Sequence, residues 1–293
     1  MSSWSYPFPG PGNQLGEDGV VLVETALLGQ GLPSLDNLKI AEMWPFSKRA
    51  RLLWLAEGRV KAGDLADFLK IRRETGFKRV DDRYLVQAIT RRESGFLTAS
   101  AAMRIAAGAG FSTVATAGMG GIRGHAVSAD LSCLINLPVL LVATAPKDSL
   151  DLGRTVDHLR RNNVKVIGYN TGVCSGFLFK GKPVILDGRF KDGPLQNKTT
   201  APGVLLLNPL PLKSLCSDRQ LLREAMAAGE VAVKNGGAYH PAVNKSLDRA
   251  TGGVLSLIQM QALIGNTWLA LNLNNQTEPA VNNILPNGRK IQP

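Results

Sequence analysis

Cysteine and histidine are scarce in this 293-residue chain, which contains three of each. Cys133, Cys174 and Cys216 lie far apart, and apolar or small residues flank each of them. This spacing argues against a disulfide framework and a zinc site, and it favours the reduced thiols of a cytoplasmic protein. His158 and His240 also lack metal-ligand spacing, so we expect them at the surface or in packing contacts.

Long apolar runs are missing as well. No stretch approaches the roughly 20 residues that cross a bilayer, and residues 1–7 contain no basic segment followed by an apolar one. We therefore expect neither a membrane span nor a secretory signal. Hydrophobic residues make up 44% of the chain and the mean hydropathy is +0.01, which is typical of a soluble globular protein with a sizeable core.

Aromatic residues amount to only 6%, and the sequence contains no recognisable nucleic-acid-binding module. Lysine and arginine outnumber aspartate and glutamate by 34 to 23, for a net charge of +11. The basic residues are scattered in ones and twos, as on solvated helix faces. We therefore expect no nucleic-acid partner, and a phosphate-bearing small molecule explains the positive charge better.

The two ends of the chain differ from its middle. Residues 1–17 are rich in proline, glycine and serine and predict an irregular arm, whereas residues 272–293 predict a polar tail. Between them, residues 18–271 form one predicted α/β domain. Apolar strands are expected at 20–24, 112–116, 137–144, 164–169 and 203–208, and helices at 96–107, 149–162 and 218–234. This alternation predicts a three-layer α/β/α sandwich around a largely parallel or mixed sheet.

Charged residues stand where two of these strands end, which is where ligands collect in open α/β sheets. Lys147 follows the apolar run 137–144 in the loop before the next helix. A lysine in such a turn can lose hydration and become an amine nucleophile, although most loop lysines are solvated. Glu24 follows three apolar residues, and desolvation there suits either a general acid or a structural carboxylate bonded to backbone amides.

A glycine-rich turn, T-A-G-M-G-G-I-R-G, follows the strand at 112–116. Its glycines can expose backbone N–H groups to a phosphate, but it lacks the ending of a P-loop. Arg123 and His125 can donate to an anion there. Ser128 and Asp130 are spaced as a helix cap or as a ligand-binding pair, and Asn208 stands at the end of the last predicted strand.

Seven short strings in one order resemble the pseudouridine-5′-phosphate glycosidase family, also called indigoidine synthase A-like. The resemblance covers about residues 19 to 271. The strings are V-V-L-V-E-T-A-L-L-G-Q-G-L-P, A-T-A-G-M-G-G-I-R-G, S-A-D-L, A-P-K-D-S-L-D-L-G, V-I-G-Y-N-T, L-L-N-P-L-P and T-G-G.

The resemblance implies an α/β/α fold, a homotrimer, and reversible cleavage of pseudouridine 5′-phosphate to uracil and ribose 5-phosphate. The family's proton-donor glutamate matches Glu24 and its Schiff-base lysine matches Lys147. Its substrate-binding Ser-Ala-Asp matches Ser128, Ala129 and Asp130. The other residues that we predict to bind substrate are Thr98, Ala99, Arg123, His125 and Asn208.

The implied chemistry suits these residue types. A carbon–carbon glycosidic bond has no heteroatom leaving group, so capture of C1′ of the opened ribose as an iminium on Lys147 supplies the electron sink. The base then leaves as a carbon leaving group that Glu24 helps to protonate. A partly dry pocket favours both the neutral amine and the protonated carboxyl.

The chain also departs from the family pattern. The position of the family's metal-binding aspartate is Ala126, which offers no ligand oxygen, so the family's Mn²⁺ is not expected and no cofactor is predicted. A substrate-binding lysine is missing at Ala88, a late asparagine is replaced by Leu257, and a histidine is replaced by Gln30. Two alternatives stay open: a synthase that joins ribose 5-phosphate to another acceptor in specialised metabolism, and a non-catalytic homologue.

Overall fold

The computed structural model describes residues 19–191 and 201–275, so the predicted arm at 1–17 and the tail beyond 275 lie outside the described residues. Within these ranges the central sheet has ten strands. Their order is β15 (Gly188–Phe190), β12 (Lys165–Tyr169), β16 (Val204–Leu207), β10 (Leu140–Ala143), β6 (Thr113–Ala115), β1 (Val21–Val23), β2 (Ala50–Ala56), β5 (Gly95–Leu97) and β4 (Lys78–Val80), with β3 (Arg59–Gly63) paired to β2.

Most neighbouring strands in this sheet are parallel. The run from β15 to β2 is parallel throughout, β4 is parallel to β5, and only β3 and β5 pair antiparallel with β2. The five strands expected from apolar runs correspond to β1, β6, β10, β12 and β16. Every residue of β1, β6, β10 and β16 is buried, as required of a sheet covered on both faces.

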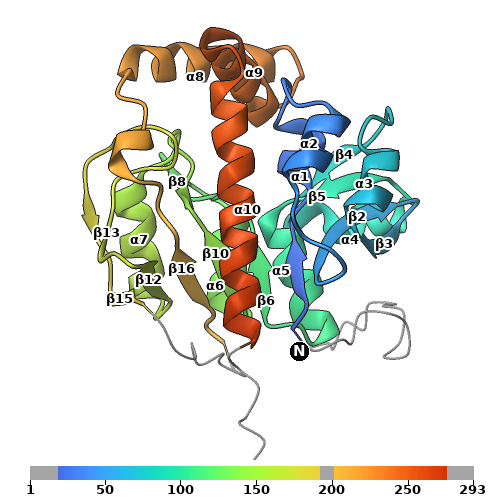
Figure 1. Cartoon of the computed structure of the whole chain (residues 1–293), viewed down its shortest axis with the longest axis horizontal. Coiled ribbons are helices and arrows are strands. Elements are labelled where there is room, and N and C mark those ends of the chain that lie inside the picture. The colour runs from blue at the N-terminus through green and yellow to red at the C-terminus, as the bar shows by residue number, and fades with distance from the viewer. Residues whose placement is uncertain (1–18, 192–200, 276–293) are drawn as a thin grey trace, which may run out of the picture.

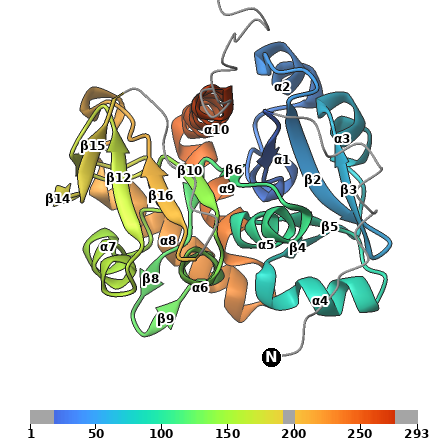
Figure 2. The same cartoon turned by 90° about the horizontal axis from the view of Figure 1, so that it is seen from below.

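Helices cover both faces of the sheet, as Figure 2 shows. α10 (Val254–Asn275) packs on one face against β1, β6 and β10, while α5 (Ala99–Ala109) and α7 (Leu152–Arg161) pack on the other, with α6 (Ala129–Asn136) between them. The predicted three-layer α/β/α fold is therefore confirmed. The other described helices are α1 (Ala26–Gln30), α2 (Asn37–Met43), α3 (Leu65–Ile71), α4 (Asp82–Thr90), the 3₁₀ helix η1 (Leu212–Ser214), α8 (Arg219–Lys234) and α9 (Tyr239–Thr251).

Two helices close one end of the molecule. α8 and α9 pack against each other and lie across the end at which β1 leads into α1 (Figure 1). Because β1, β6, β10 and β16 are parallel, their carboxyl ends all point toward this end. The pair α8–α9 therefore covers the sheet edge where ligands bind in folds of this class.

The antiparallel strand β5 also brings its carboxyl end to this edge. It pairs with the far half of β2, so it enters from beyond β1 and ends beside it. Leu97 accepts a hydrogen bond from the backbone N–H of Thr25 at 3.0 Å and donates its own to Thr25 Oγ1 at 3.1 Å. The segment after β5 and the residues of β4 therefore lie close to the segment that follows β1.

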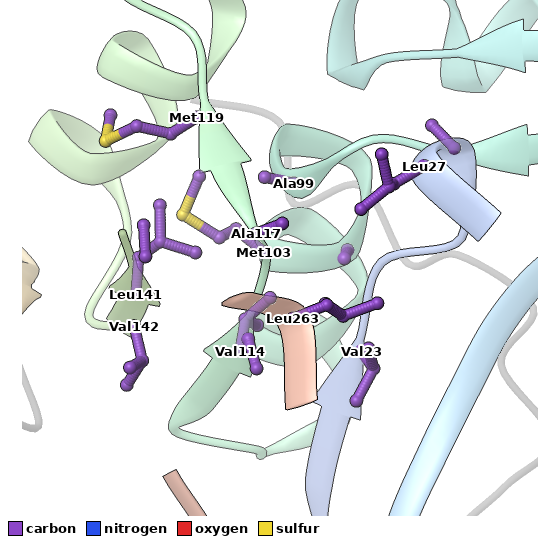
Figure 3. Packing of buried hydrophobic residues seen from close by; sticks show 14 of the residues in the cluster. Val23, Leu27, Ala99, Met103, Val114, Ala117, Met119, Leu141, Val142 and Leu263 are labelled. Carbon is purple, nitrogen blue, oxygen red and sulfur yellow. The ribbon is translucent and has the colours of Figure 1, made fainter. Parts of the chain in front are cut away.

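Hydrophobic side chains fill the space on both sides of β6. Figure 3 shows Met103 from α5, Val23 from β1, Leu141 from β10 and Leu263 from α10 gathered around Val114. All five side chains are fully buried, and each such burial stabilises the fold by roughly 1.5–3 kcal/mol. This packing gives the loops at the strand ends a rigid support.

Two expected helices begin later than predicted. The helix expected at 96–107 begins at Ala99, because Gly95–Leu97 has ladder partners in β2 and β4 and forms a strand instead. The helix expected from 149 begins at Leu152. There Asp151 is the N-cap, and its carboxylate accepts a hydrogen bond from Arg154 N at 2.9 Å, which satisfies one of the free N–H groups of the first turn.

Strand β10 and the C-terminal helix also differ from their expected bounds. β10 begins at Leu140 because residues 137–139 connect it to α6, which ends at Asn136. α10 continues to Asn275, past the position at which the sequence predicts the start of the tail. Sequence periodicity did not show α10, because its apolar residues surround the whole helix rather than forming one stripe.

The same helix corrects the expectation about apolar runs. Over Val254–Asn274, α10 is long and apolar enough to cross a membrane by length and composition, with a mean hydropathy of 1.4. Of this stretch, 56% is buried within the fold, where it packs on β1, β6 and β10. A core helix of a soluble protein meets the same two criteria, so the finding is weak evidence of a span.

Candidate active site

A cavity opens at the carboxyl ends of the strands, beneath α9. It contains about 520 Å³ of space between its atoms, counting the part open to solvent. Strand-end loops, β4, α1, α9 and α10 form its walls. The lining residues are Glu24, Ala26, Leu27, Gln30, Gly31, Arg79, Thr98, Ala99, Thr116, Gly118, Asp130, Lys147, His240, Pro241, Asn244 and Gln259.

Lys147 reaches the cavity from a short extension of the sheet. Beyond β6 and β10 the chain continues as the parallel pair β7 (Gly118–Met119) and β11 (Ala145–Pro146). Lys147 follows β11 directly, and its N–H donates to Met119 O at 3.0 Å. The turn closes as Leu150 N donates to Lys147 O at 2.9 Å, so the backbone of the lysine is held on both sides.

The next residue, Asp148, anchors this turn to a distant loop. Its carboxylate accepts hydrogen bonds from the backbone N–H groups of Phe177, Leu178 and Phe179 at 2.9, 2.8 and 3.2 Å. Burial nevertheless raises the pKa of Asp148 to about 6, against the opposing effect of these bonds. Asp148 faces away from the cavity lining and acts as a support for the lysine turn.

The environment of Lys147 favours its neutral amine. Burial is the main cause that lowers its pKa to about 8, and the positive charge of Arg79 lowers it further. The carboxylates of Glu24 and Asp130 oppose this shift. With a pKa of about 8, about one-tenth of the amine is neutral at pH 7, compared with a few in ten thousand for an ordinary lysine.

Glu24 lies in the same cavity with only 5% of its surface exposed. Its backbone N–H extends the sheet by donating to Ala115 O at 3.2 Å. One carboxyl oxygen accepts from Leu27 N and the other from Thr116 Oγ1, both at 3.3 Å. Burial raises the pKa of Glu24, although Lys147 and Arg79 oppose the shift, so the site favours the acid form that a proton donor requires.

Asp130 joins these residues from the start of α6. It is 8% exposed, and its carboxylate accepts from Ser100 N at 2.9 Å and from Gly120 N at 2.6 Å. It therefore ties the first turn of α5 to the glycine-rich turn, which places Thr98 and Ala99 in the cavity wall. The structure thus brings together Glu24 and Lys147 with three of the predicted substrate-binding residues.

The other five predicted substrate-binding residues do not line the cavity. Ala129 is buried in the first turn of α6. The Oγ of Ser128 is buried without a partner in the described part of the chain and packs against Gly120, where an added Cβ would lie 2.4 Å away. Asn208 instead donates to Asn266 Oδ1 at 3.1 Å. These predictions were wrong about direct lining, because motif spacing does not show which way a side chain points.

Asn208 belongs to a buried network that joins α10 to the strand ends. Asn266 is fully buried, and its amide donates to Thr116 O at 2.7 Å and to Thr144 Oγ1 at 3.0 Å. The network satisfies carbonyls where β6 and β10 leave the main sheet. Asn208 and Asn266 therefore hold the cavity wall without lining it themselves.

Arg123 and His125 lie on a hairpin outside the cavity, formed by β8 (Ile122–Arg123) and β9 (Ala126–Val127). His125 is exposed. Arg123 forms an ion pair with Glu230 of α8 and lies over the ring of Tyr239, with its guanidinium carbon 4.5 Å from the centroid. The structure therefore corrects the expected role of Arg123, which fastens the cap α8–α9 to the glycine-rich turn.

Removing this fastening is expected to loosen the cap. An exposed ion pair contributes about 0.2–1 kcal/mol and an exposed cation–π contact about 0.5–1 kcal/mol. Arg123→Ala should therefore speed hydrogen exchange in α9 by about 3- to 30-fold, whereas Glu230→Ala, which loses only the ion pair, should speed it less. Arg249 is an exposed arginine that belongs to α9 itself, and Arg249→Ala serves as the control. Unchanged exchange in Arg123→Ala would refute the fastening role.

Several cavity residues were absent from the predicted site. Gln30 was noted only as a departure from the family pattern, and its amide donates to Phe77 O at 3.0 Å. Arg79 comes from β4, while His240, Asn244 and Gln259 come from α9 and α10. No local signal marked them, since each reaches the cavity only through packing of elements far apart in the sequence. His240 is a packing residue as expected, with its ring edge-on against Tyr239, but it also lines the cavity, which the sequence did not indicate.

The chain lacks a polar residue of the family pattern at Ala88 and at Leu257, and in each case another residue brings a polar group to the cavity. Ala88 is fully buried in α4 and does not line the cavity, whereas Arg79 supplies a cation there. Leu257 does not line the cavity either, but the amide of Gln259, two positions further along α10, does. The cavity therefore contains a cation and an amide that Ala88 and Leu257 do not supply.

The metal expected of the family does not fit the described residues. Ala126 is exposed on β9 and has no ligand atom, and the described ranges contain no group of three or more His, Cys, Asp or Glu side chains able to hold an ion. The oxygens of Glu24 and Asp130 already accept hydrogen bonds from the protein. A divalent cation requires several free oxygen ligands.

Together these features define an α/β/α protein with a half-buried lysine and a buried glutamate in one cavity at the carboxyl edge of a mostly parallel sheet. The family model described as indigoidine synthase A-like protein matches residues 15–273. The chain belongs to this family, as a distant member.

Curated relatives carry the name pseudouridine-5′-phosphate glycosidase. The protein of that name from Salinispora tropica is 30% identical over 280 residues, which cover 87% of this chain and 86% of the relative. The one from Frankia alni is 28% identical over 277 residues, covering 87% of this chain and 76% of the relative.

Two solved structures share the fold. An indigoidine synthase A-like protein from Thermotoga maritima superposes with a TM-score of 0.73 at 22% identity, over 88% of this chain and 93% of the other. The prealnumycin C-glycosynthase AlnA, solved in complex with ribulose 5-phosphate, superposes with a TM-score of 0.66 at 22% identity, over 87% and 90%. At this identity both comparisons establish the fold alone.

Proposed function

We propose that this protein is a C-glycosidic ribosyl enzyme that cleaves pseudouridine 5′-phosphate reversibly to uracil and ribose 5-phosphate. The observation that carries the proposal is the shared cavity of Lys147 and Glu24, in which burial lowers the pKa of the amine and raises that of the carboxyl. The curated names of the relatives support the same reaction class.

The reaction proceeds through a covalent imine. The neutral amine of Lys147 forms a bond to C1′ while the C1′–O4′ bond breaks and O4′ takes up a proton. The nitrogen lone pair then forms C=N as the C1′–C5 bond breaks, and the electron pair on C5 takes the proton of Glu24. Water adds to the iminium and releases ribose 5-phosphate, so that one water is consumed for each bond cleaved.

Arg79 is the residue best suited to the phosphate. It lines the cavity, and no carboxylate in the described part of the chain forms an ion pair with it. A guanidinium with free donors binds phosphate through two parallel hydrogen bonds. The hydroxyls of Thr98 and Thr116 lie in the same wall. Thr116 Oγ1 donates to Glu24, and its oxygen can still accept a hydrogen bond from a sugar hydroxyl.

A synthase that joins ribose 5-phosphate to a different acceptor is the second candidate. The departures from the family pattern at Ala88, Ala126 and Leu257 favour it, because an altered set of residues suits a changed acceptor. The imine on Lys147 is common to both directions.

We propose in addition that the protein is a cytoplasmic homotrimer, for which light scattering measures the mass.

The test begins with the wild-type protein, ribose 5-phosphate and borohydride. Reduction of the imine should add the mass of the reduced sugar phosphate, and peptide mapping should place it on Lys147. Release of uracil from pseudouridine 5′-phosphate then supports the glycosidase. An adduct without uracil release indicates the synthase, and absence of any adduct refutes both enzymatic functions and leaves a binding homologue.

The rate of trapping is expected to depend on pH in a way that reports Lys147. The neutral amine is the reactive form, and its pKa is lowered to about 8, so trapping should accelerate about tenfold per pH unit between pH 6 and 7.5 and level off above 8. Turnover also requires the acid form of Glu24, and because burial raises the pKa of this carboxyl, the proton is retained to a higher pH than in an ordinary glutamate. A rate that continues to rise up to pH 10 would contradict the lowered pKa.

A further inference from the structure

The cavity has two walls of different character. The wall at the sheet edge contains charged side chains, namely Glu24, Arg79, Asp130 and Lys147. The part of the opposite wall that belongs to α9 presents uncharged side chains, with His240 and Asn244 one helical turn apart on the same face. An uncharged polar surface suits a neutral ligand group, whereas the charged wall suits the sugar phosphate.

The position of this helix is fixed by contacts on several sides. Asn244 donates to Gly31 O at 3.0 Å, and Ser34 hydrogen-bonds Asp248. On the side of α8, Gly229 allows the ring of Tyr239 to approach so closely that an added Cβ would lie 2.6 Å from it. The imidazole of His240 therefore enters the cavity from a rigid base, as a binding group must.

Charges around His240 keep its ring neutral. Burial, together with Lys147, Arg79 and Arg123, lowers its pKa to about 2, and no carboxylate contributes to the opposite effect. Its ring packs edge-on against Tyr239 at 5.3 Å between centroids. A neutral imidazole offers one donor and one acceptor, and a carboxamide such as that of Asn244 offers both kinds as well.

We propose that His240, together with Asn244, recognises the base that leaves or enters at C1′, and that this base is a neutral planar heterocycle with adjacent N–H and C=O groups. The inference rests on the proposed function and concerns only the base half of the substrate. His240 is a specificity-determining residue that contacts the base, and the imine forms without it.

The proposal predicts that a change at His240 affects turnover of pseudouridine 5′-phosphate but not trapping of ribose 5-phosphate. Trapping of ribose 5-phosphate on Lys147 involves no base, so His240→Leu should leave the trapping rate within about twofold. The same change should lower kcat/KM for pseudouridine 5′-phosphate by about 10- to 100-fold, the loss expected when a buried hydrogen-bonding group is left unpaired. His240→Asn keeps a neutral donor and acceptor and should recover most of this loss.

Tyr239→Phe is the matched control. It removes a buried hydroxyl that has no partner among the described residues, one position from His240 and outside the cavity lining, so turnover should remain within about twofold. Thermal unfolding of each variant reports whether α9 is still folded. The inference is overturned if the His240→Leu protein has an unchanged kcat/KM, or if that protein is folded but is no longer trapped by ribose 5-phosphate and borohydride. A wild-type protein that is not trapped overturns the proposed function and this inference with it.

Discussion

Replacing Lys147 with alanine is expected to abolish covalent capture of ribose 5-phosphate and to reduce turnover by about 10⁴-fold or more, the scale of loss when a covalent nucleophile is removed. The reason is chemical: no other lysine lines the described cavity, so no second amine can form the imine. Mass spectrometry after borohydride reduction and a uracil-release assay measure the two effects.

The fold should tolerate this change. Burial lowers the pKa of the amine, which means that the folded state pays a desolvation penalty for its charged form, so Lys147→Ala should keep or raise the melting temperature at pH 7. Lys147→Arg retains a cation that cannot form an imine and should be equally inactive. Lys182→Ala removes an exposed lysine and should behave as wild type. Turnover by a folded Lys147→Ala protein would refute the imine mechanism.

Replacing Glu24 with glutamine is expected to lower uracil release by about 10²–10⁴-fold, the range for removal of a general acid. Glutamine keeps the size of the side chain and an oxygen that can accept from Leu27 N, but it has no proton to deliver to C5. Because imine formation depends on Lys147, trapping of ribose 5-phosphate should continue in this variant.

The comparison of these two variants assigns the steps. Lys147→Ala should lose trapping and turnover together, whereas Glu24→Gln should lose turnover and keep trapping. Glu42→Gln changes an exposed carboxylate of α2 and controls for the loss of a negative charge. A Glu24→Gln protein with turnover within about threefold of wild type would mean that another group protonates the base.

The sheet and its central strands were predictable because their signal is local. Continuous apolar runs such as Leu140–Ala143 occur where a strand is buried on both faces, and polar residues directly after such runs indicate the strand ends. Other elements lacked such a signal. The helix α10 is apolar on all sides, and β5 is only three residues long and pairs with residues of β2 that are 40 and 42 positions away.

The predicted site residues also fall into two groups, those that line the cavity and those that do not. Glu24 and Lys147 follow predicted strands and Asp130 begins a predicted helix, so their type and spacing indicated a common edge. Thr98 and Ala99 were predicted to bind substrate but were expected within the helix at 96–107. Ser128, Ala129, Arg123, His125 and Asn208 shared that placement but turn away from the cavity. Side-chain direction depends on the exact turn geometry, which the motif strings do not specify.

The amino-acid order alone was enough to predict a covered, largely parallel or mixed sheet with a lysine and a glutamate at its carboxyl edge, since burial patterns and strand-end positions are properties of short segments. The folded arrangement was needed to establish the rest of the cavity. Arg79 reaches the cavity because β4 pairs with β5, which in turn pairs antiparallel with β2, and His240 and Gln259 reach it through the packing of α9 and α10. These placements depend on contacts between separate elements, whose energies no local pattern records.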